Sequence, residues 1–246
     1  MFFHKTYKPF LLPSAKMGNI SIPEFSAFFS LFDGLVEYIY MTDEIFGVLT
    51  FLIAMLISYY SYRIFNFTKK RDYLWFSGGF YLIAIGFLTR FIFDFSFDTM
   101  RLDKSMFFGT MEFEPFQKML LLASMLFILA GYILLLLVAL KTKKRVSLLI
   151  FIISLVALLV SQNYYVTFLA ILAVVIFTLL FHFYRNFNQK RTLNAGIVWY
   201  SFLLIFIGCL MEMLMFISNK FYILSNLFNM GGFLLLLVNF VLVLRK

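Results

Sequence analysis

The sequence predicts an all-α integral membrane protein, with seven transmembrane helices in a three-one-three parallel repeat and an amphipathic surface helix before them. Composition is the first observation: 63% of the 246 residues are hydrophobic and only 13% are charged, whereas soluble domains are about half apolar and a quarter charged. The second is a series of continuous apolar runs of about 20 residues, the length of helix that crosses a bilayer. The third is a sequence pattern around the first two runs that returns around the fifth and sixth.

The chain before the first run, residues 1–43, is predicted to be an extracytoplasmic N-terminal segment. Ser21-Ile22-Pro23-Glu24 has the proline and the Ser-to-Glu spacing of a helix start. Phenylalanine and aliphatic residues then recur at helical spacing, opposite a face of serine and acidic residues. This pattern indicates an amphipathic helix that lies on the membrane surface or packs over the mouth of the bundle.

Seven hydrophobic runs make up the predicted transmembrane domain, residues 44–246. Their hydrophobicity is continuous and not alternating, which indicates helices. The predicted spans lie at about 44–64, 73–93, 118–140, 146–160, 166–185, 194–217 and 223–244, the fourth being short. Glycines inside the runs are predicted points of close helix packing: Gly78, Gly79, Gly86, Gly131, Gly208, Gly231 and Gly232.

The distribution of positive charge sets the predicted orientation. Most of the 21 Lys and Arg residues lie in the connections after the first, third and fifth runs and at the C-terminal end. Positively charged loops stay in the cytoplasm, so a multi-pass protein of the cell membrane is expected, with the N-terminus outside and the C-terminus inside. The net charge of +9 follows from this topology and from contact with anionic lipid headgroups. It does not indicate nucleic-acid binding.

An internal repeat organises the predicted domain. Tyr62-Arg63-x-Phe65-Asn66 returns as Tyr184-Arg185-x-Phe187-Asn188. A basic turn follows each copy, and then an apolar helix with Leu-Ile-x-Ile-Gly-x-Leu, at 82–88 and 204–210. The match predicts two repeat units, about 44–140 and 166–244, with the fourth helix as connector. Both units enter the membrane in the same direction, so the repeat is parallel.

Arg90 and Glu212 are the main candidate site residues, because they carry opposite charges at equivalent positions of the two repeats. Charged groups inside spans usually face the bundle interior and pair; the alternative is that each reaches the outer headgroups separately. Other polar residues are expected at the same outer level and complete a predicted outward-facing polar pocket: Asp94, Gln117, Asn226 and Asn229.

Catalytic and metal-binding motifs are absent from the sequence. There is no His-Glu-x-x-His, no Gly-x-Ser-x-Gly and no phosphate-binding loop. Cys209 is the single cysteine, so one chain has neither a disulfide nor a cysteine-rich metal site. We therefore expect a protein that is not an enzyme and that uses no cofactor.

Seven spans with an outside N-terminus resemble several membrane families. Microbial rhodopsins share the outline, but residues 223–244 lack the lysine that retinal requires. The seven-helix sugar-efflux transporters share the parallel plan, but the spans here lack their paired prolines. The hairpin from Tyr62-Arg63 through Arg71-Asp72-Tyr73-Leu74 resembles the seven-helix sensory membrane domains of microbes. That resemblance implies a sensor whose output comes from a cytoplasmic or lateral membrane protein partner.

The leading functional prediction is a non-enzymatic, sensor-like or partner-binding module of the lipid bilayer. A small-solute transporter or channel that works through the parallel repeats is the first alternative. A structural subunit of a larger membrane assembly is the second. A transporter predicts flux in liposomes, whereas an assembly subunit predicts co-purification with partners in fixed ratio.

Overall fold

The computed structural model describes residues 43–102, 114–140, 144–218 and 220–244. These residues form seven α-helices and one short 3-10 helix, and none of them is in a strand. Six of the helices are long and apolar enough to cross a membrane, which confirms an all-α, multi-pass membrane protein. The expected amphipathic helix falls outside the described residues. The elements are α3 (Asp43–Thr68), α4 (Arg71–Leu102), α5 (Glu114–Leu140), α6 (Lys144–Val160), α7 (Tyr164–Lys190), α8 (Leu193–Met213), η1 (Leu214–Phe216) and α9 (Lys220–Leu244).

The predicted spans correspond one to one to these helices, with differences at the ends. α4 continues to Leu102, beyond the predicted end of its span at 93, because no Gly or Pro interrupts residues 94–102. α6 has 17 residues, about 26 Å at the rise of an α-helix, which is shorter than the roughly 30 Å of a bilayer core. The fourth predicted segment is therefore present as a short apolar helix, and it is not among the six helices long enough to cross a membrane.

Two helix pairs are joined by the same tight turn. Lys69 ends α3 in the left-handed region at φ 55°, and its N–H donates to the carbonyl of Phe65 at 2.7 Å. Arg191 ends α7 at φ 48°, and its N–H donates to the carbonyl of Phe187 at 2.8 Å. Among the described residues these are the two non-glycine residues with positive φ. Left-handed C-caps stop a helix sharply, which lets α4 and α8 fold back at once.

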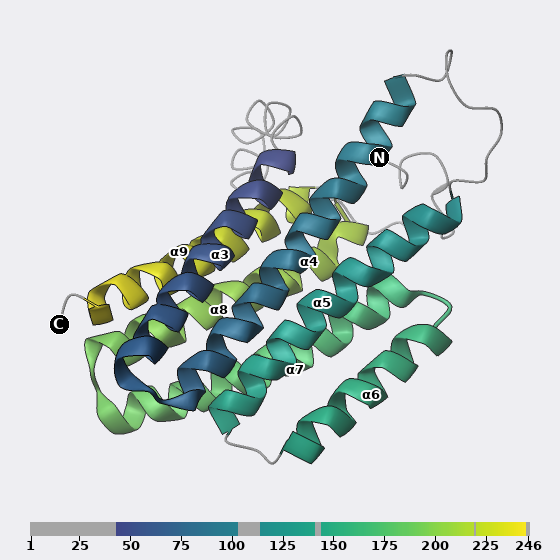
Figure 1. Cartoon of the computed structure of the whole chain (residues 1–246). Coiled ribbons are helices and arrows are strands. Elements are labelled where there is room, and N and C mark those ends of the chain that lie inside the picture. The colour runs from purple at the N-terminus through teal and green to yellow at the C-terminus, as the bar shows by residue number, and fades with distance from the viewer. Residues whose placement is uncertain (1–42, 103–113, 141–143, 219, 245–246) are drawn as a thin grey trace, which may run out of the picture. The chain divides into compact units, whose positions relative to one another are not determined.

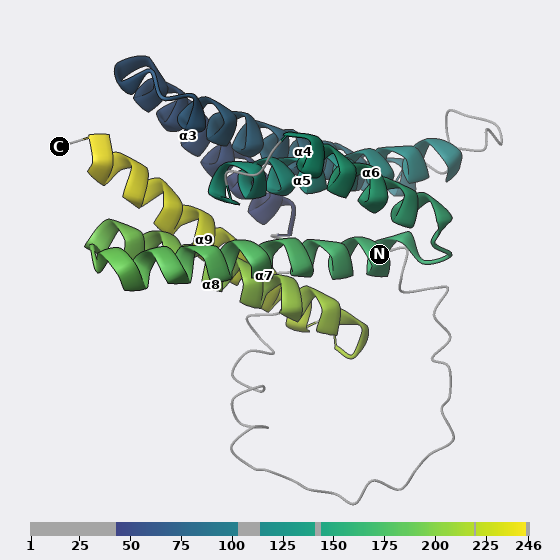
Figure 2. The same ribbon diagram turned by 90° about the horizontal axis from the view of Figure 1, so that it is seen from below.

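The helices form two layers (Figures 1 and 2). We call α3–α5 the first unit and α7–α9 the second unit. Within each unit, consecutive helices pack side by side. Between the units, α3 packs against α9 and α5 packs against α7, while α6 lies at the edge against α5 and α7.

Glycines allow close approach of the second and third helices within each unit. A Cβ on Gly131 of α5 would lie 2.6 Å from the carbonyl oxygen of Gly79 on α4. A Cβ on Gly232 of α9 would lie 2.8 Å from the carbonyl oxygen of Ser201 on α8. These distances are too short for any side chain, so the predicted packing role is confirmed at Gly131 and Gly232, and the same holds for Gly79, Gly86 and Gly208.

Gly78 and Gly231 are exceptions to that prediction. A Cβ on Gly78 would meet nothing within 4 Å, and one on Gly231 would make only an ordinary contact of 3.8 Å with Leu204. Each lies next to a packing glycine, and neighbouring residues of a helix point about 100° apart. Only one glycine of each pair can therefore face the partner helix.

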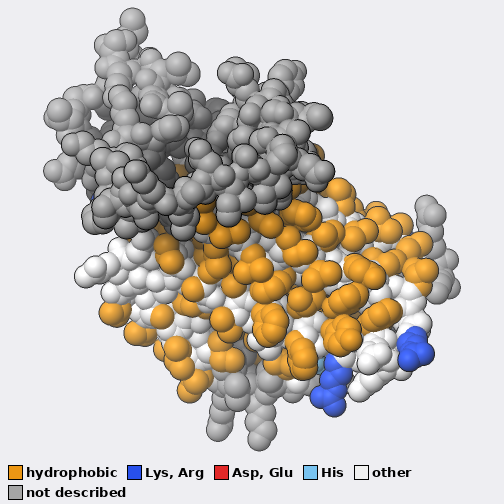
Figure 3. Space-filling model, turned by 180° about the vertical axis from the view of Figure 1, so that it is seen from behind, with side chains coloured by type: hydrophobic (Ala, Val, Ile, Leu, Met, Phe, Trp, Pro, Cys, Tyr) orange, Lys and Arg blue, Asp and Glu red, His pale blue; other side chains and the backbone are white. Residues whose placement is uncertain are grey.

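The outside of the bundle is apolar, as lipid contact requires. Large hydrophobic side chains in the middle of helices are exposed, for example Val174 at 66%. Figure 3 views the second unit from behind and shows hydrophobic side chains over most of the visible described face, with Lys and Arg visible at one end. The inside is filled by Leu, Ile and Phe side chains from all seven helices.

Candidate functional site

The candidate site lies at one end of the bundle, where six helices contribute residues from matching ends. The helices run alternately up and down, so the starts of α3, α5, α7 and α9 lie level with the C-terminal parts of α4 and α8. Arg90 is on α4, two-thirds of the way along, and Glu212 is next to the last residue of α8. The structure brings these two side chains together.

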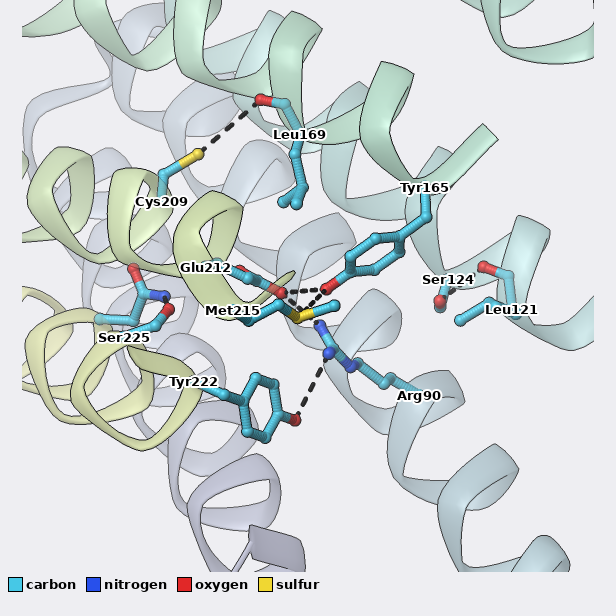
Figure 4. A network of polar contacts seen from close by, with 11 residues as sticks. Arg90, Leu121, Ser124, Tyr165, Leu169, Cys209, Glu212, Met215, Tyr222 and Ser225 are labelled. Atoms are coloured by element: carbon cyan, nitrogen blue, oxygen red, sulfur yellow. Dashed lines mark hydrogen bonds and ion pairs between the residues drawn. The ribbon is translucent and has the colours of Figure 1, made fainter. Parts of the chain in front are cut away.

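Glu212 is the centre of a small polar network (Figure 4). Its Oε1 lies 3.3 Å from Nη1 of Arg90. The hydroxyl of Tyr165, on α7, donates to the same oxygen at 2.7 Å. Arg90 also donates from Nη2 to the hydroxyl of Tyr222, on α9, at 3.4 Å. The network thus joins α4 of the first unit to all three helices of the second.

The distances within the network separate a tight contact from looser ones. A charge-assisted hydrogen bond between Arg and a carboxylate is usually about 2.7–2.9 Å long and often bidentate. The contact of Arg90 with Glu212 is longer, at 3.3 Å, and uses one oxygen. The bond from Tyr165 is short, at 2.7 Å. Of the two contacts that Glu212 Oε1 makes, the one with Tyr165 is therefore the tighter.

The two charged groups differ in burial. The side chain of Glu212 is 11% exposed and that of Arg90 is 24% exposed. A carboxylate in an apolar surrounding is costly unless it is paired and hydrogen-bonded, and Glu212 has both kinds of partner. Arg90 additionally lies over the ring of Tyr222, with 6.0 Å between Cζ and the ring centroid, at the outer limit for a cation–π contact.

A cavity of about 60 Å³ opens beside this network. That is room for a few water molecules or one small ligand, since one water needs about 10–15 Å³. Its walls are mostly aromatic and aliphatic, with Arg90 and Glu212 as the charged groups among the described lining residues. The lining residues are Phe46, Gly47, Thr50, Phe87, Arg90, Phe91, Ile128, Tyr132, Phe168, Leu172, Ile176, Ile205, Cys209, Glu212, Tyr222, Asn226 and Asn229.

Four of the six predicted site residues line this cavity: Arg90, Glu212, Asn226 and Asn229. The Nδ2 of Asn229 donates to the hydroxyl of Ser225 one turn earlier, at 3.3 Å. Asp94 belongs to α4 and Gln117 to α5, and their side chains lie outside the described part of the structure. The four residues that line the cavity are among those that the sequence predicts for an outward-facing polar pocket.

The tyrosines of the site were missed. Tyr165 and Tyr222 complete the network, and Tyr132 lines the cavity. The sequence could have indicated Tyr222, because it stands four residues before Asn226 and seven before Asn229 and therefore lies on the same face of a helix. Tyr165 has a weaker signal, since a tyrosine at the start of a span is most often an interfacial anchor.

The arrangement suits the binding of a small molecule. Among the residues that the structure describes, no group of three or more His, Cys, Asp or Glu side chains comes together. The site instead presents donors and acceptors of hydrogen bonds in an apolar enclosure, the usual design of a small-molecule pocket. Comparison of the chain with protein-family models, with curated proteins and with solved structures gives no match.

Proposed function

We propose that this protein is a non-enzymatic, sensor-like membrane module that binds a small polar ligand in the cavity between its two units. The observation that carries the proposal is the ion pair of Arg90 and Glu212 beside that cavity, held by Tyr165 and Tyr222. Ionisable residues in spans are costly and are functional candidates by default. Here they meet at a cavity that is lined by residues of six helices.

The cavity faces the outside in the orientation that we propose. The basic turns at 69–71 and 190–191 lie at the end of the bundle opposite to the network, because α3 and α7 end there. Positively charged connections stay in the cytoplasm. A ligand would then enter from the extracytoplasmic side, and the hairpin at Lys69–Arg71 would face a cytoplasmic partner, as the resemblance to sensory domains implies.

The two units are proposed to be copies of one three-helix unit. The turns at Lys69 and Arg191, 122 positions apart, share their backbone conformation and their hydrogen bond. If the two units trade places, the contact of α3 with α9 becomes the contact of α7 with α5, and the reverse. The pair of contacts between the units is therefore symmetric. This symmetry is what a pseudo-twofold axis along the membrane normal produces. Arg90 and Glu212 meet close to such an axis.

The third helices of the two units also share a sequence pattern, which supports the duplication, but the copies are separated by fewer residues than those of the first two helices. Ser124-x-Leu126-Phe127-x-x-x-Gly131 in α5 returns 101 residues later as Ser225-x-Leu227-Phe228-x-x-x-Gly232 in α9. Gly131 packs on Gly79 and Ile83, and Gly232 packs on Ser201 and Ile205. Gly79 and Ser201 are 122 positions apart in the sequence, and so are Ile83 and Ile205. The offset of the third helices is 21 residues shorter, so the first unit has that many more residues than the second between its second helix and its third, in the stretch from α4 to α5.

Transport is the second candidate function. Transporters built from repeats bind their substrates near the interface of the repeats, and the cavity has that position here. The two candidates differ in one measurable property, because a sensor binds its ligand without moving it. A ligand that stabilises the protein would therefore be tested for saturable uptake into proteoliposomes, which the sensor proposal predicts to be absent.

Gly47 provides a sharp test of the cavity. It lines the cavity, and a Cβ placed on it would meet nothing within 4 Å. Gly47→Leu should therefore fill the cavity without disturbing the helix. Gly78→Leu is the matched control, because a Cβ on Gly78 also meets nothing but Gly78 lies outside the cavity. Both changes replace a helical glycine, so their effects on helix propensity are alike.

The full-length protein and both variants would be screened in nanodiscs for thermal stabilisation by amino acids, organic acids, amines and polyols. A ligand at 100 times its Kd stabilises the folded state by about 2.7 kcal/mol. We expect at least one compound to stabilise the wild type and Gly78→Leu but not Gly47→Leu. Equal stabilisation of all three proteins, or of none, would overturn the binding proposal.

A further inference from the structure

The described walls of the cavity carry one positive and one negative charge and are otherwise uncharged. Arg90 and Glu212 supply these charges, and the neighbouring walls include Phe87, Phe91 and Phe168. A ligand with a single net charge would leave one charge uncompensated among apolar side chains, which is costly. A ligand with no net charge avoids that cost. Such a ligand gains most when it has a group for each member of the pair.

The geometry of Glu212 leaves room for a cationic group. Both hydrogen bonds that it accepts, from Arg90 and Tyr165, end on Oε1. Its Oε2 has no hydrogen-bond partner among the described residues, although Glu212 lines the cavity. A carboxylate has about four acceptor positions on its two oxygens. An ammonium group in the cavity can therefore bind Oε2 while Tyr165 continues to hold Oε1.

Arg90 is suited to the anionic group of the same ligand. Its contact with Glu212 uses one oxygen at 3.3 Å. A guanidinium gains more from two parallel bonds to one carboxylate. A ligand carboxylate can replace the long contact with a bidentate one, while the ligand ammonium compensates Glu212. The exchange keeps each buried charge paired.

We propose that the ligand is a small zwitterion of the amino-acid type, with its ammonium on Glu212 and its carboxylate on Arg90. This inference rests on the proposed ligand-binding function. The cavity of about 60 Å³ limits the ligand to a small molecule with a short apolar part. The aromatic walls also suit the ammonium, since cations are attracted to ring faces.

The test compares probes that differ in charge. Glycine, L-alanine, β-alanine and γ-aminobutyrate represent zwitterions, propionate the anion, ethylamine the cation and glycerol the uncharged polar compound. Each is added at the same concentration and ionic strength to the full-length protein in nanodiscs, and Kd is derived from the stabilisation. We expect at least one zwitterion to bind at least about tenfold more tightly than the other three classes, which corresponds to ~1.4 kcal/mol.

Variants of the pair should change this preference in opposite directions. Glu212→Gln leaves a positive cavity and should favour propionate over zwitterions by about tenfold. Arg90→Gln leaves a negative cavity and should favour ethylamine. The double variant Arg90→Gln with Glu212→Gln removes both charges of the pair together, so neither member is left without the other, and it should bind zwitterions at least tenfold more weakly.

The outcomes distinguish the two proposals. Tightest wild-type binding of propionate, ethylamine or glycerol would overturn the zwitterion inference and leave the binding function in place. An unchanged affinity for zwitterions in the double variant would also overturn it. If no compound of any charge class stabilises the wild type, the proposed binding function itself is wrong.

Discussion

Glu212 shows how one buried carboxylate is made compatible with a membrane interior. Its Oε1 accepts a bond of 2.7 Å from Tyr165 and a contact of 3.3 Å from Arg90. Hydrogen bonds to charged groups contribute about 1.5–3 kcal/mol, more than neutral ones. The shorter bond comes from the uncharged partner. Tyr165 should therefore contribute to the stability of the bundle and not only to the shape of the site.

Removal of one hydroxyl tests this role. Tyr165→Phe should lower the free energy of unfolding by about 1.5–3 kcal/mol, because Glu212 loses its shortest hydrogen bond. Tyr222→Phe is the matched control, since the contact of the Tyr222 hydroxyl with Arg90 is longer, at 3.4 Å, and does not involve Glu212. Thermal unfolding in detergent measures both. An equal or larger loss in Tyr222→Phe would show that Tyr165 does not fix Glu212.

At the scale of the element, small residues decide how closely the helices approach. Gly131 and Gly232 hold α5 against α4 and α9 against α8. Without a hydrophobic force between helices in lipid, such close packing is a main source of association. The third helix of each unit is therefore fixed at equivalent points.

Alanine at these glycines should push the helix pairs apart. Gly131→Ala would place a Cβ 2.6 Å from a backbone oxygen, and Gly232→Ala would place one at 2.8 Å. Each should destabilise the protein by about 1–3 kcal/mol, as overpacking does. Gly78→Ala meets nothing and should be neutral or stabilising through helix propensity. Comparable unfolding temperatures for all three variants would contradict the packing role.

The helices themselves were predictable because lipid imposes strong rules on sequence. Each span needs a continuous apolar run, and each of the seven runs forms a helix. The predicted span at 73–93 agrees with the membrane-crossing part of α4, Arg71–Phe93. The helix itself continues to Leu102, because a helix that leaves the membrane can include polar residues such as Asp94. Which glycine of each pair faces a neighbour depends on the rotation of the helix, so Gly78 and Gly231 were assigned a packing role that they do not have.

At the scale of the whole molecule, the alignment of two distant segments predicted the contact at the centre of the site. Arg90 and Glu212 are 122 residues apart and meet across the two units. Their opposite charges inside apolar runs were visible in the sequence. Tyr165 and Tyr132 were not predictable in the same way, because tyrosines in spans have several common roles. The cavity was not predictable, because its shape depends on how side chains from six helices pack together. The sequence of one hydrophobic run does not determine that packing.

Arg90 and Glu212 join the two units beside a shared cavity. The most direct measurement is a charge swap within a double-mutant cycle. Arg90→Ala and Glu212→Ala should each cost on the order of 2 kcal/mol, between the values of exposed and buried pairs, because the Arg90 side chain is 24% exposed.

The swap Arg90→Glu with Glu212→Arg should recover part of that loss in unfolding free energy. The loss of unfolding free energy in the double variant Arg90→Ala with Glu212→Ala should differ from the sum of the two single losses by a coupling energy of about 0.5–3 kcal/mol. Additive losses in the cycle, together with no recovery in the swap, would show that the two charges act independently, and the account of a shared site would be wrong.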